Sequence, residues 1–231
     1  MFMNIDKKIN YKNPGAIKIF ENFIEHTLLK KSLLDLVDYD WNPVWSDKRY
    51  AGEHWMTCPL IEEFNKTPNF NLFDIASILE NKMKCKIKNL MFYAMLPGGN
   101  IPPHRDMVGN IGFGGLRLHV PVVTNPDVNF VVSGKKVVMS VGELWALDTS
   151  YTHSVSNFGK ENRIHLVMDV IVNDWVIDLL PPKNFKYYLH QFHIIILGAI
   201  KFLRYTFSKE MKMSDFFGVV WASIKLKFGK K

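Results

Sequence analysis

The fold is decided by residues 116–172, which read LRLHVPVVTNPDVNFVVSGKKVVMSVGELWALDTSYTHSVSNFGKENRIHLVMDVIV. Short runs rich in Val, Ile and aromatic residues alternate here with turn residues such as Gly134, Gly142 and Gly159. Many short strands separated by turns are typical of a β-sandwich, a jelly roll or a barrel. A fold built from βαβ units would need helices of about ten or more residues between strands, and this segment has no room for them. Counting one strand before the segment, the expected strands are Lys86–Leu96, Leu116–Val123, Val128–Val132, Lys136–Val141, Leu144–Asp148, Thr152–Ser156 and Arg163–Val172.

Helices are expected on both sides of this β region. Apolar residues recur at steps of three and four between Pro14 and Val37, and Phe70–Lys82 resembles a second short helix. The Trp- and Pro-rich stretch Trp41–Pro68 between them is interpreted as an irregular loop. After Pro181 and Pro182 the aromatic-rich, basic segments Phe185–Phe207 and Met213–Phe228 again favour helix.

The expected fold class is therefore α+β with a mainly β core: a sandwich, jelly roll or barrel flanked by N-terminal and C-terminal helices. We expect residues 1–84 to form an N-terminal helical and loop segment that packs on the core. Residues 85–175 form the core itself. Residues 176–231 form a basic helical tail.

Composition indicates a folded protein in a reducing compartment. The chain has 231 residues, of which 48% are hydrophobic and 22% charged, enough for one domain with a substantial core. Its two cysteines, Cys58 and Cys85, form no CxxC pair, which argues against a disulfide framework or a zinc-thiolate site. The N-terminus lacks the apolar core of a signal peptide, and no apolar run reaches the roughly 18 residues of a membrane-spanning helix. A cytoplasmic location is expected.

The net charge of +7 is concentrated in the tail. Residues 183–231 carry ten Lys and Arg against two acidic residues, a net charge of +8, so the rest of the chain sums to −1. No basic groove with interleaved aromatic residues marks the body, and nucleic-acid binding is not expected. For the tail, two interpretations stay open: a helix packed on the core with a solvated basic face, or peripheral contact with an anionic membrane.

His104, Asp106 and His153 are the candidate metal ligands. His104 and Asp106 are one residue apart, so on a strand both side chains face the same side. His153 follows near the far end of the β region. Two imidazoles and one carboxylate form the facial triad of non-haem Fe(II) oxygenases, which leaves open positions on the metal.

An H-x-D pair alone is weak evidence, and Arg163 strengthens it. This arginine lies ten residues after His153, and a buried arginine near the metal would bind a carboxylate such as the distal end of 2-oxoglutarate. Arg117 with His119, and Arg163 with His165, repeat a cation and a histidine at i and i+2. The alternative interpretation is that His119 and His165 are half-buried histidines bonded to backbone and that Arg117 is a surface arginine.

Six motifs follow one another between Met95 and Val170. They are MLPGG (95–99) leading to PHRD (103–106), LRLHVP (116–121), GELW (142–145), HSVSN (153–157) and RIHL (163–166). Together they resemble the aspartyl/asparaginyl β-hydroxylase family, a branch of the 2-oxoglutarate oxygenases. The resemblance covers about a third of the chain and implies a double-stranded β-helix, or jelly-roll, fold.

The resemblance also implies roles for individual residues. His104 and His153 would bind Fe(II), and Arg163 would bind the C5 carboxylate of 2-oxoglutarate. Arg117 and His119 match the family's R-x-H element, which implies contacts to the C1 end of the cosubstrate. Fe(II), 2-oxoglutarate and O2 are the implied cofactor and cosubstrates.

Three further residues are assigned to the cosubstrate pocket: His165, Tyr93 and Met95. Tyr93 stands where some members carry a serine two residues before the methionine of the M-x-P-G element, and its phenol could bond the same carboxylate. Asp106 is a second departure, because some animal members lack a carboxylate ligand. This chain therefore resembles a member with the full triad.

The resemblance implies a dioxygenase that hydroxylates an Asp/Asn-type peptidyl or free amino-acid substrate. The partner would be a protein, a peptide or a small amino acid, contacted by the loops Trp41–Pro68 and Gly109–Gly115. Because some relatives hydroxylate lipid acyl chains, a lipid hydroxylase at a membrane surface stays an alternative. A non-catalytic jelly-roll metal-binding module and a cupin-like enzyme without 2-oxoglutarate are further alternatives. The complete ligand set argues against the first, and Arg163 argues against the second.

Overall fold

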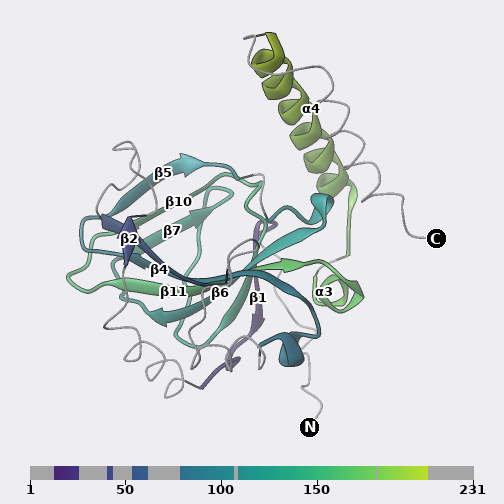
Figure 1. The fold of residues 1–231 in the computed structure, drawn as a ribbon. Coiled ribbons are helices and arrows are strands. Elements are labelled where there is room, and N and C mark those ends of the chain that lie inside the picture. The colour runs from purple at the N-terminus through teal and green to yellow at the C-terminus, as the bar shows by residue number, and fades with distance from the viewer. Residues whose placement is uncertain are drawn as a thin grey trace. The chain divides into compact units, whose positions relative to one another are not determined.

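The computed structural model describes residues 13–25, 41–43, 54–61, 79–106, 109–180 and 182–207. The chain divides into two compact units, residues 1–110 with 115–180, and residues 111–114 with 181–231. The first unit contains two antiparallel β-sheets, and the second includes helix α4 (Phe185–Phe207) (Figure 1). The predicted jelly-roll architecture is confirmed.

The larger sheet has seven strands in the order β1-β9-β6-β11-β4-β3-β2, and the smaller has four in the order β5-β10-β7-β8. Every pairing in both sheets is antiparallel. The strands are β1 (Ala16–Phe20), β2 (Asn42–Pro43), β3 (Trp55–Ile61), β4 (Ile87–Met95), β5 (Asn100–His104), β6 (Gly115–Val123), β7 (Val128–Val132), β8 (Lys135–Lys136), β9 (Leu144–Leu147), β10 (His153–Asn157) and β11 (Arg163–Ile171).

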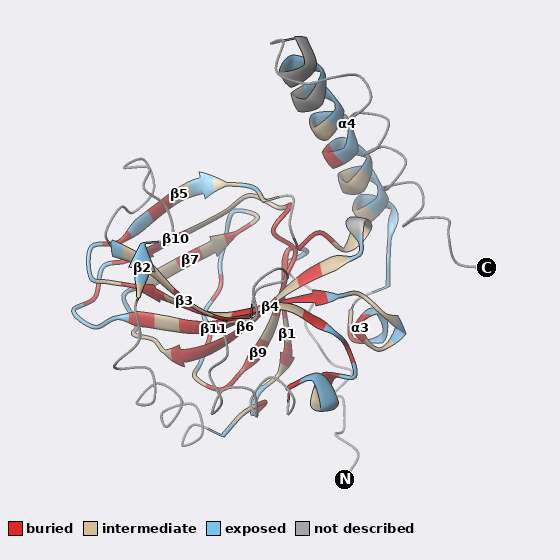
Figure 2. Ribbon diagram, in the orientation of Figure 1, coloured by how far each residue is buried: buried red, intermediate tan, exposed pale blue. Residues whose placement is uncertain are grey.

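A core cluster joins the two sheets. Met95 and Leu147 from the larger sheet pack with Ile101, Phe130 and Val155 from the smaller one. Figure 2 shows buried residues running along the central strands of the larger sheet. Burying these large apolar side chains stabilises the packing of the two sheets by about 1.5–3 kcal/mol each.

Strand β11 places apolar side chains on one face of the larger sheet and its polar side chains on the other. Side chains alternate along a strand, so Leu166 and Met168 lie on one face while Arg163, His165 and Asp169 lie on the other. The register pairs Asp169 with Arg117 of β6 and His165 with Tyr93 of β4. Directly paired residues share a face. The polar residues of three neighbouring strands therefore gather on the face that looks toward the smaller sheet.

The N-terminal helix expected from Pro14 is wrong where the structure describes it. Residues Ala16–Phe20 form β1, which pairs with β9 at the edge of the larger sheet. The β-branched residues Ile17 and Ile19 are both buried in this strand, and pairing with a sheet edge outweighs the helical spacing. The remainder of the expected helix, beyond residue 25, lies outside the described residues.

The loop expected over Trp41–Pro68 is also wrong in part, because β2 and β3 extend the sheet beyond β4. Pro59 lies inside β3 and concealed the strand pattern. Of the helix expected over Phe70–Lys82, the described part contains helical residues 79–83. The predicted N-terminal segment thus contributes strands to the same sheet as the predicted core.

Within the β region most expected strands agree with the structure to within one or two residues. Two differences stand out. Strand β5 was missed because Pro102 and Pro103 lie in it, and the run Lys136–Val141 leaves the sheet after Lys136. Helix α4 matches the expected bounds, whereas Met213–Phe228 lies outside the described residues. The short helix α3 (Asp174–Asp178), which Asn173 caps by accepting a bond from the Val176 N–H, was not expected.

Replacing Gly15 with Ala tests the strand assignment of the N-terminal segment. A Cβ at Gly15 would lie 2.7 Å from Val132 Cγ1 and 2.9 Å from Tyr151 Cβ. We therefore expect Gly15→Ala to lower the free energy of unfolding by about 1–3 kcal/mol, as overpacking does. In the helix first expected there, the same change would raise stability by about 0.5–1 kcal/mol. Urea unfolding followed by circular dichroism measures the sign, and an increase in stability would contradict the strand.

Candidate metal and cosubstrate site

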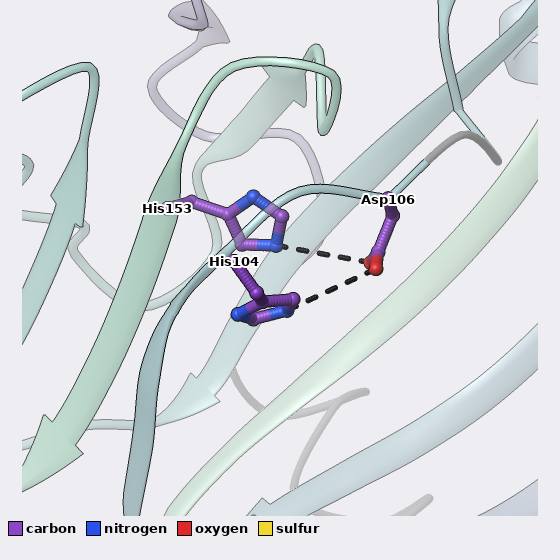
Figure 3. Close-up of side chains that lie close together, drawn as sticks. All are labelled: His104, Asp106 and His153. Carbon is purple, nitrogen blue, oxygen red and sulfur yellow. Dashed lines mark ion pairs between the residues drawn. The ribbon is translucent and has the colours of Figure 1, made fainter. Parts of the chain in front are cut away.

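His104, Asp106 and His153 converge at one point between the sheets. His104 ends β5, His153 begins β10, and these two residues are direct partners in the β5–β10 pairing. Asp106 Oδ1 lies 3.9 Å from His104 Nε2, and Asp106 Oδ2 lies 3.8 Å from His153 Nε2 (Figure 3). One ligand atom from each residue lies within 4.8 Å of the others. This spacing suits three ligands on one face of a metal ion.

Asp106 is held at this point by a contact other than the shared strand that the sequence predicted. It lies beyond the end of β5 rather than on a strand with His104. Its backbone N–H donates to the carbonyl of Thr149 at 2.9 Å, which ties the segment after β5 to the one before β10. The carboxylate therefore owes its position to a tertiary hydrogen bond and not to the alternation of a strand.

Both imidazoles are held in the tautomer that binds metal through Nε2. His104 Nδ1 lies 2.8 Å from the Pro102 carbonyl, and His153 Nδ1 lies 3.0 Å from the Tyr151 carbonyl. A carbonyl only accepts, so each Nδ1 carries the hydrogen and each Nε2 keeps its lone pair. Burial lowers the pKa of His153, which keeps this imidazole neutral near pH 7. The donor set of two imidazole Nε2 atoms and one carboxylate thus fits a divalent transition metal.

A cavity of about 600 Å³, which includes space open to solvent, surrounds the triad. Its lining combines cationic and apolar side chains from both sheets. Besides the triad, it is lined by Gly15, Trp55, Tyr93, Ile101, Arg117, His119, Phe130, Val132, Leu147, Asp148, Thr149, Val155 and Arg163.

Arg163 brings a buried positive charge into this cavity without a counter-charge. The residue is 4% exposed, and its Nη2 donates to His165 Nδ1 at 3.1 Å. Its Nε has no hydrogen-bond partner, and no carboxylate of the described residues forms an ion pair with it. Burial lowers its pKa to about 10. An isolated buried cation is costly, so the site favours an anionic ligand that would neutralise it.

The environment of Arg163 is otherwise neutral. Its guanidinium carbon lies 5.5 Å from the centre of the Phe130 ring. Because arginine can only donate, His165 Nδ1 must accept, and His119 Nδ1 at 3.3 Å must then carry the hydrogen between them. Burial lowers the pKa of both histidines well below 6.5, with the charge of Arg163 as a further cause. His119 and His165 therefore add no charge near pH 7.

Arg117 differs from Arg163 because its charge is already neutralised. Its Nε and Nη2 donate to the two carboxylate oxygens of Asp169 at 2.7 and 3.0 Å. Burial acts to lower the pKa of Arg117, but the hydrogen bonds and charge of Asp169 outweigh it and raise that pKa above its ordinary value. Its Nη1 lies 3.7 Å from Asp106 Oδ2. Asp169 was missed in the sequence, although it shares the inner face of β11 with Arg163 at an even spacing.

Of the three remaining residues expected in the pocket, one lines the cavity and two do not. Tyr93 lines the cavity, and its ring lies 5.4 Å from that of Trp55. Met95 is fully buried in the core cluster and is not part of the lining. His165 does not line this cavity, and with Arg163 it lines a second one of about 770 Å³, which includes space open to solvent. Trp55 and Phe130 had no motif that marked them.

Solved structures with a similar fold include oxygenases from two bacteria. An oxidoreductase of the 2OG-Fe(II) oxygenase family from Burkholderia pseudomallei is similar with a TM-score of 0.51 and 12% identity, over 68% of this chain and 84% of that chain. A prolyl-4-hydroxylase from Pseudomonas putida is similar with a TM-score of 0.50 and 12% identity, over 69% of this chain and 93% of that chain. At these identities the likeness establishes the fold. No curated protein matches the sequence significantly.

The sequence itself matches a family model. The model describes aspartyl/asparaginyl beta-hydroxylase and matches residues 32–172, more than half of the chain. The matched range includes His104, Asp106 and His153 as well as Arg163, so it covers the metal-ligand cluster and the unneutralised cation. The chain belongs to the aspartyl/asparaginyl beta-hydroxylase family and is a 2-oxoglutarate-dependent, Fe(II)-dependent oxygenase.

Proposed function

We propose that this enzyme hydroxylates an Asp/Asn-type side chain in a peptide, or a free amino acid. His104, Asp106 and His153 bind Fe(II) in this proposal, and Arg163 anchors 2-oxoglutarate. The observation that carries the proposal is the occurrence, in one cavity, of the His104, Asp106 and His153 triad and a buried arginine that forms no ion pair with any described carboxylate. The triad would bind the metal, and the buried arginine would bind a dicarboxylate cosubstrate.

His104, Asp106 and His153 would hold Fe(II) as a facial triad, a ligand set that leaves coordination positions open. When bound, Fe(II) and 2-oxoglutarate supply the oxidising power for C–H hydroxylation. The chain supplies orientation: backbone carbonyls fix both imidazoles, and the Thr149 carbonyl fixes the Asp106 backbone. A preset ligand geometry of this kind lowers the reorganisation that metal binding would otherwise require.

Arg163 is the better candidate for the distal carboxylate because Arg117 is already paired with Asp169. His165 accepts one N–H of Arg163 without adding charge, which orients the guanidinium and leaves its charge for the ligand. The apolar residues Phe130, Val132 and Val155 line the same cavity and limit water near the reacting groups. Exclusion of water strengthens the attraction between the guanidinium and a carboxylate.

Support for an amino-acid substrate comes from the family and from the position of Trp55. This residue belongs to the segment Trp41–Pro68, one of the two from which we expected substrate contacts, and it lines the cavity beside Tyr93. The two aromatic rings, tilted by 35° against each other, provide an apolar surface for the carbon chain of a residue. Most of that segment lies outside the described residues, as do residues 107 and 108 before the other expected loop.

A lipid acyl-chain substrate at a membrane surface is the second candidate, and helix α4 favours it. Among its exposed apolar residues, Phe185, Leu189, Phe192, Ile196 and Leu203 recur at steps of three, four and seven on one side, while Tyr188, Ile195, Leu197 and Ile200 are exposed at other angles. Figure 2 shows exposure along most of the described part of this helix.

Charge accompanies this apolar face. Lys183, Lys186 and Arg204 are exposed, and residues 183–231 carry a net charge of +8. An apolar face beside cations is typical of helices that lie in the interface of anionic membranes. In the part of the chain that the structure describes, no helix is both long and apolar enough to cross a bilayer. The proposed location is the cytoplasm, with peripheral attachment as the variant that α4 supports.

Arg163→Gln tests the cosubstrate anchor. Loss of one partner of a buried charge pair costs about 2 kcal/mol or more, so we expect the affinity for 2-oxoglutarate to fall about 30-fold or more. Calorimetric titration of 2-oxoglutarate into the Mn(II)-loaded protein measures it without turnover. Mn(II) affinity itself should stay within about threefold of wild type, and Arg204→Gln, an exposed arginine of α4, serves as the control. Unchanged 2-oxoglutarate affinity in Arg163→Gln would refute the anchor.

Phe192→Glu with Leu203→Glu tests membrane attachment through α4. We expect the wild-type protein to sediment with vesicles that contain phosphatidylserine at low salt and to remain in solution at high salt, because the attraction is screened. The double variant should lose most of this binding, since it places charge on the apolar face. Val138→Glu alters a residue that is 73% exposed in the β unit and is the matched control. Equal sedimentation of all three proteins, or none by wild type, would remove the lipid candidate.

A further inference from the structure

Asp169 lies at the centre of a cross-strand polar cluster on the inner face of the larger sheet. The register of β11 places it directly opposite Arg117 of β6 and Asn89 of β4. It accepts two hydrogen bonds from Arg117, and one at 3.3 Å from Asn89 Nδ2. The residue is buried. Two neighbouring strands therefore hold this carboxylate in a fixed position.

Arg117 connects Asp169 to the proposed metal ligand Asp106. The guanidinium is planar, so the use of Nε and Nη2 by Asp169 leaves Nη1 on the remaining edge. Nη1 lies 3.7 Å from Asp106 Oδ2, the same oxygen that lies 3.8 Å from His153 Nε2. Arg117 thus reaches Asp106 at the distance of an ion pair but beyond that of a hydrogen bond.

This arrangement balances two opposing effects on the Asp106 carboxylate. An arginine without another partner would form a bidentate pair with Asp106 and compete with the metal for its oxygens. If there were no arginine at this position, the Asp106 carboxylate would have fewer contacts to fix its orientation, because Asp106 lies beyond the end of β5. With Asp169 as its principal partner, Arg117 restrains Asp106 and leaves both carboxylate oxygens directed toward the two histidines (Figure 3).

We propose that Asp169 is a positioning residue of the metal site, which acts through Arg117 to set the orientation of Asp106. The inference rests on the proposed role of Asp106 as a metal ligand. It gives Arg117 a role toward the metal ligand Asp106, beside the contact with the C1 end of 2-oxoglutarate that the R-x-H element implied. Arg163 then remains the cavity's one cation, among the described residues, without a carboxylate partner.

Asp169→Asn in the full-length chain tests this proposal. The amide has the shape of the carboxylate but no charge, so Arg117 turns its full charge toward Asp106. We expect the affinity for Co(II), measured by titration, to fall about tenfold or more, as for other groups that orient metal ligands. The visible Co(II) spectrum should also change, because the carboxylate's coordination changes. The affinity of the Co(II)-loaded protein for 2-oxoglutarate should stay within about threefold of wild type.

Matched variants separate positioning from a loss of folding. Glu143→Gln neutralises another buried carboxylate, which pairs with Lys18 and does not line the cavity, and it should leave Co(II) affinity unchanged. Arg117→Gln provides a second route if Asp169→Asn does not fold. It should weaken Co(II) binding, and unchanged Co(II) affinity in the folded variant would overturn the proposal.

Asp106→Ala distinguishes failure of this inference from failure of the proposed function. Unchanged Co(II) affinity in Asp106→Ala would remove the metal-ligand assignment itself. Weakened Co(II) binding in Asp106→Ala, together with unchanged Co(II) binding and spectrum in a folded Asp169→Asn, would overturn only the role of Asp169.

Discussion

The pairing of β11 with β6 on one side and β4 on the other determines which side chains can reach the metal-binding residues. Because side chains alternate along each strand and paired residues share a face, one register aligns Arg163, His165 and Asp169 with their polar neighbours. A shift of one residue would turn these groups to the opposite face, where Leu118, Leu166 and Met168 are fully buried. The apolar face therefore stabilises the register, and the register in turn builds the site.

Arg117 and Arg163 lie on the same face of the sheet but differ in their neighbours, and this difference determines whether their charge is neutralised within the protein. Arg117 has a carboxylate directly across the strand pair, so its charge is satisfied within the protein. Arg163 has a neutral imidazole and an aromatic ring instead. Among the residues that the structure describes, Arg163 is thus a buried cation without an anion, which costs stability in the absence of ligand and favours anion binding. Coupling of this kind links the stability of the fold to occupancy of the site.

The sequence predicted the chemistry of the site better than the edges of the fold. His104, Asp106, His153 and Arg163 were found because metal and carboxylate recognition require particular residue types in a characteristic order. Strands β1, β3 and β5 were missed because their formation depends on partners distant in sequence, and because Pro59, Pro102 and Pro103 weaken the local strand pattern. Asp169 carried an alternation signal but no motif, and its importance follows from its cross-strand neighbours alone.

The central claim is that one cavity binds Fe(II) and 2-oxoglutarate together. Its most direct test is an anaerobic titration of the purified protein with Fe(II) and 2-oxoglutarate, watched for the weak visible metal-to-ligand charge-transfer band of the chelate. We predict a band that requires both additions and is lost in Asp106→Ala. Absence of the band from well-folded wild-type protein saturated with both compounds would contradict the account.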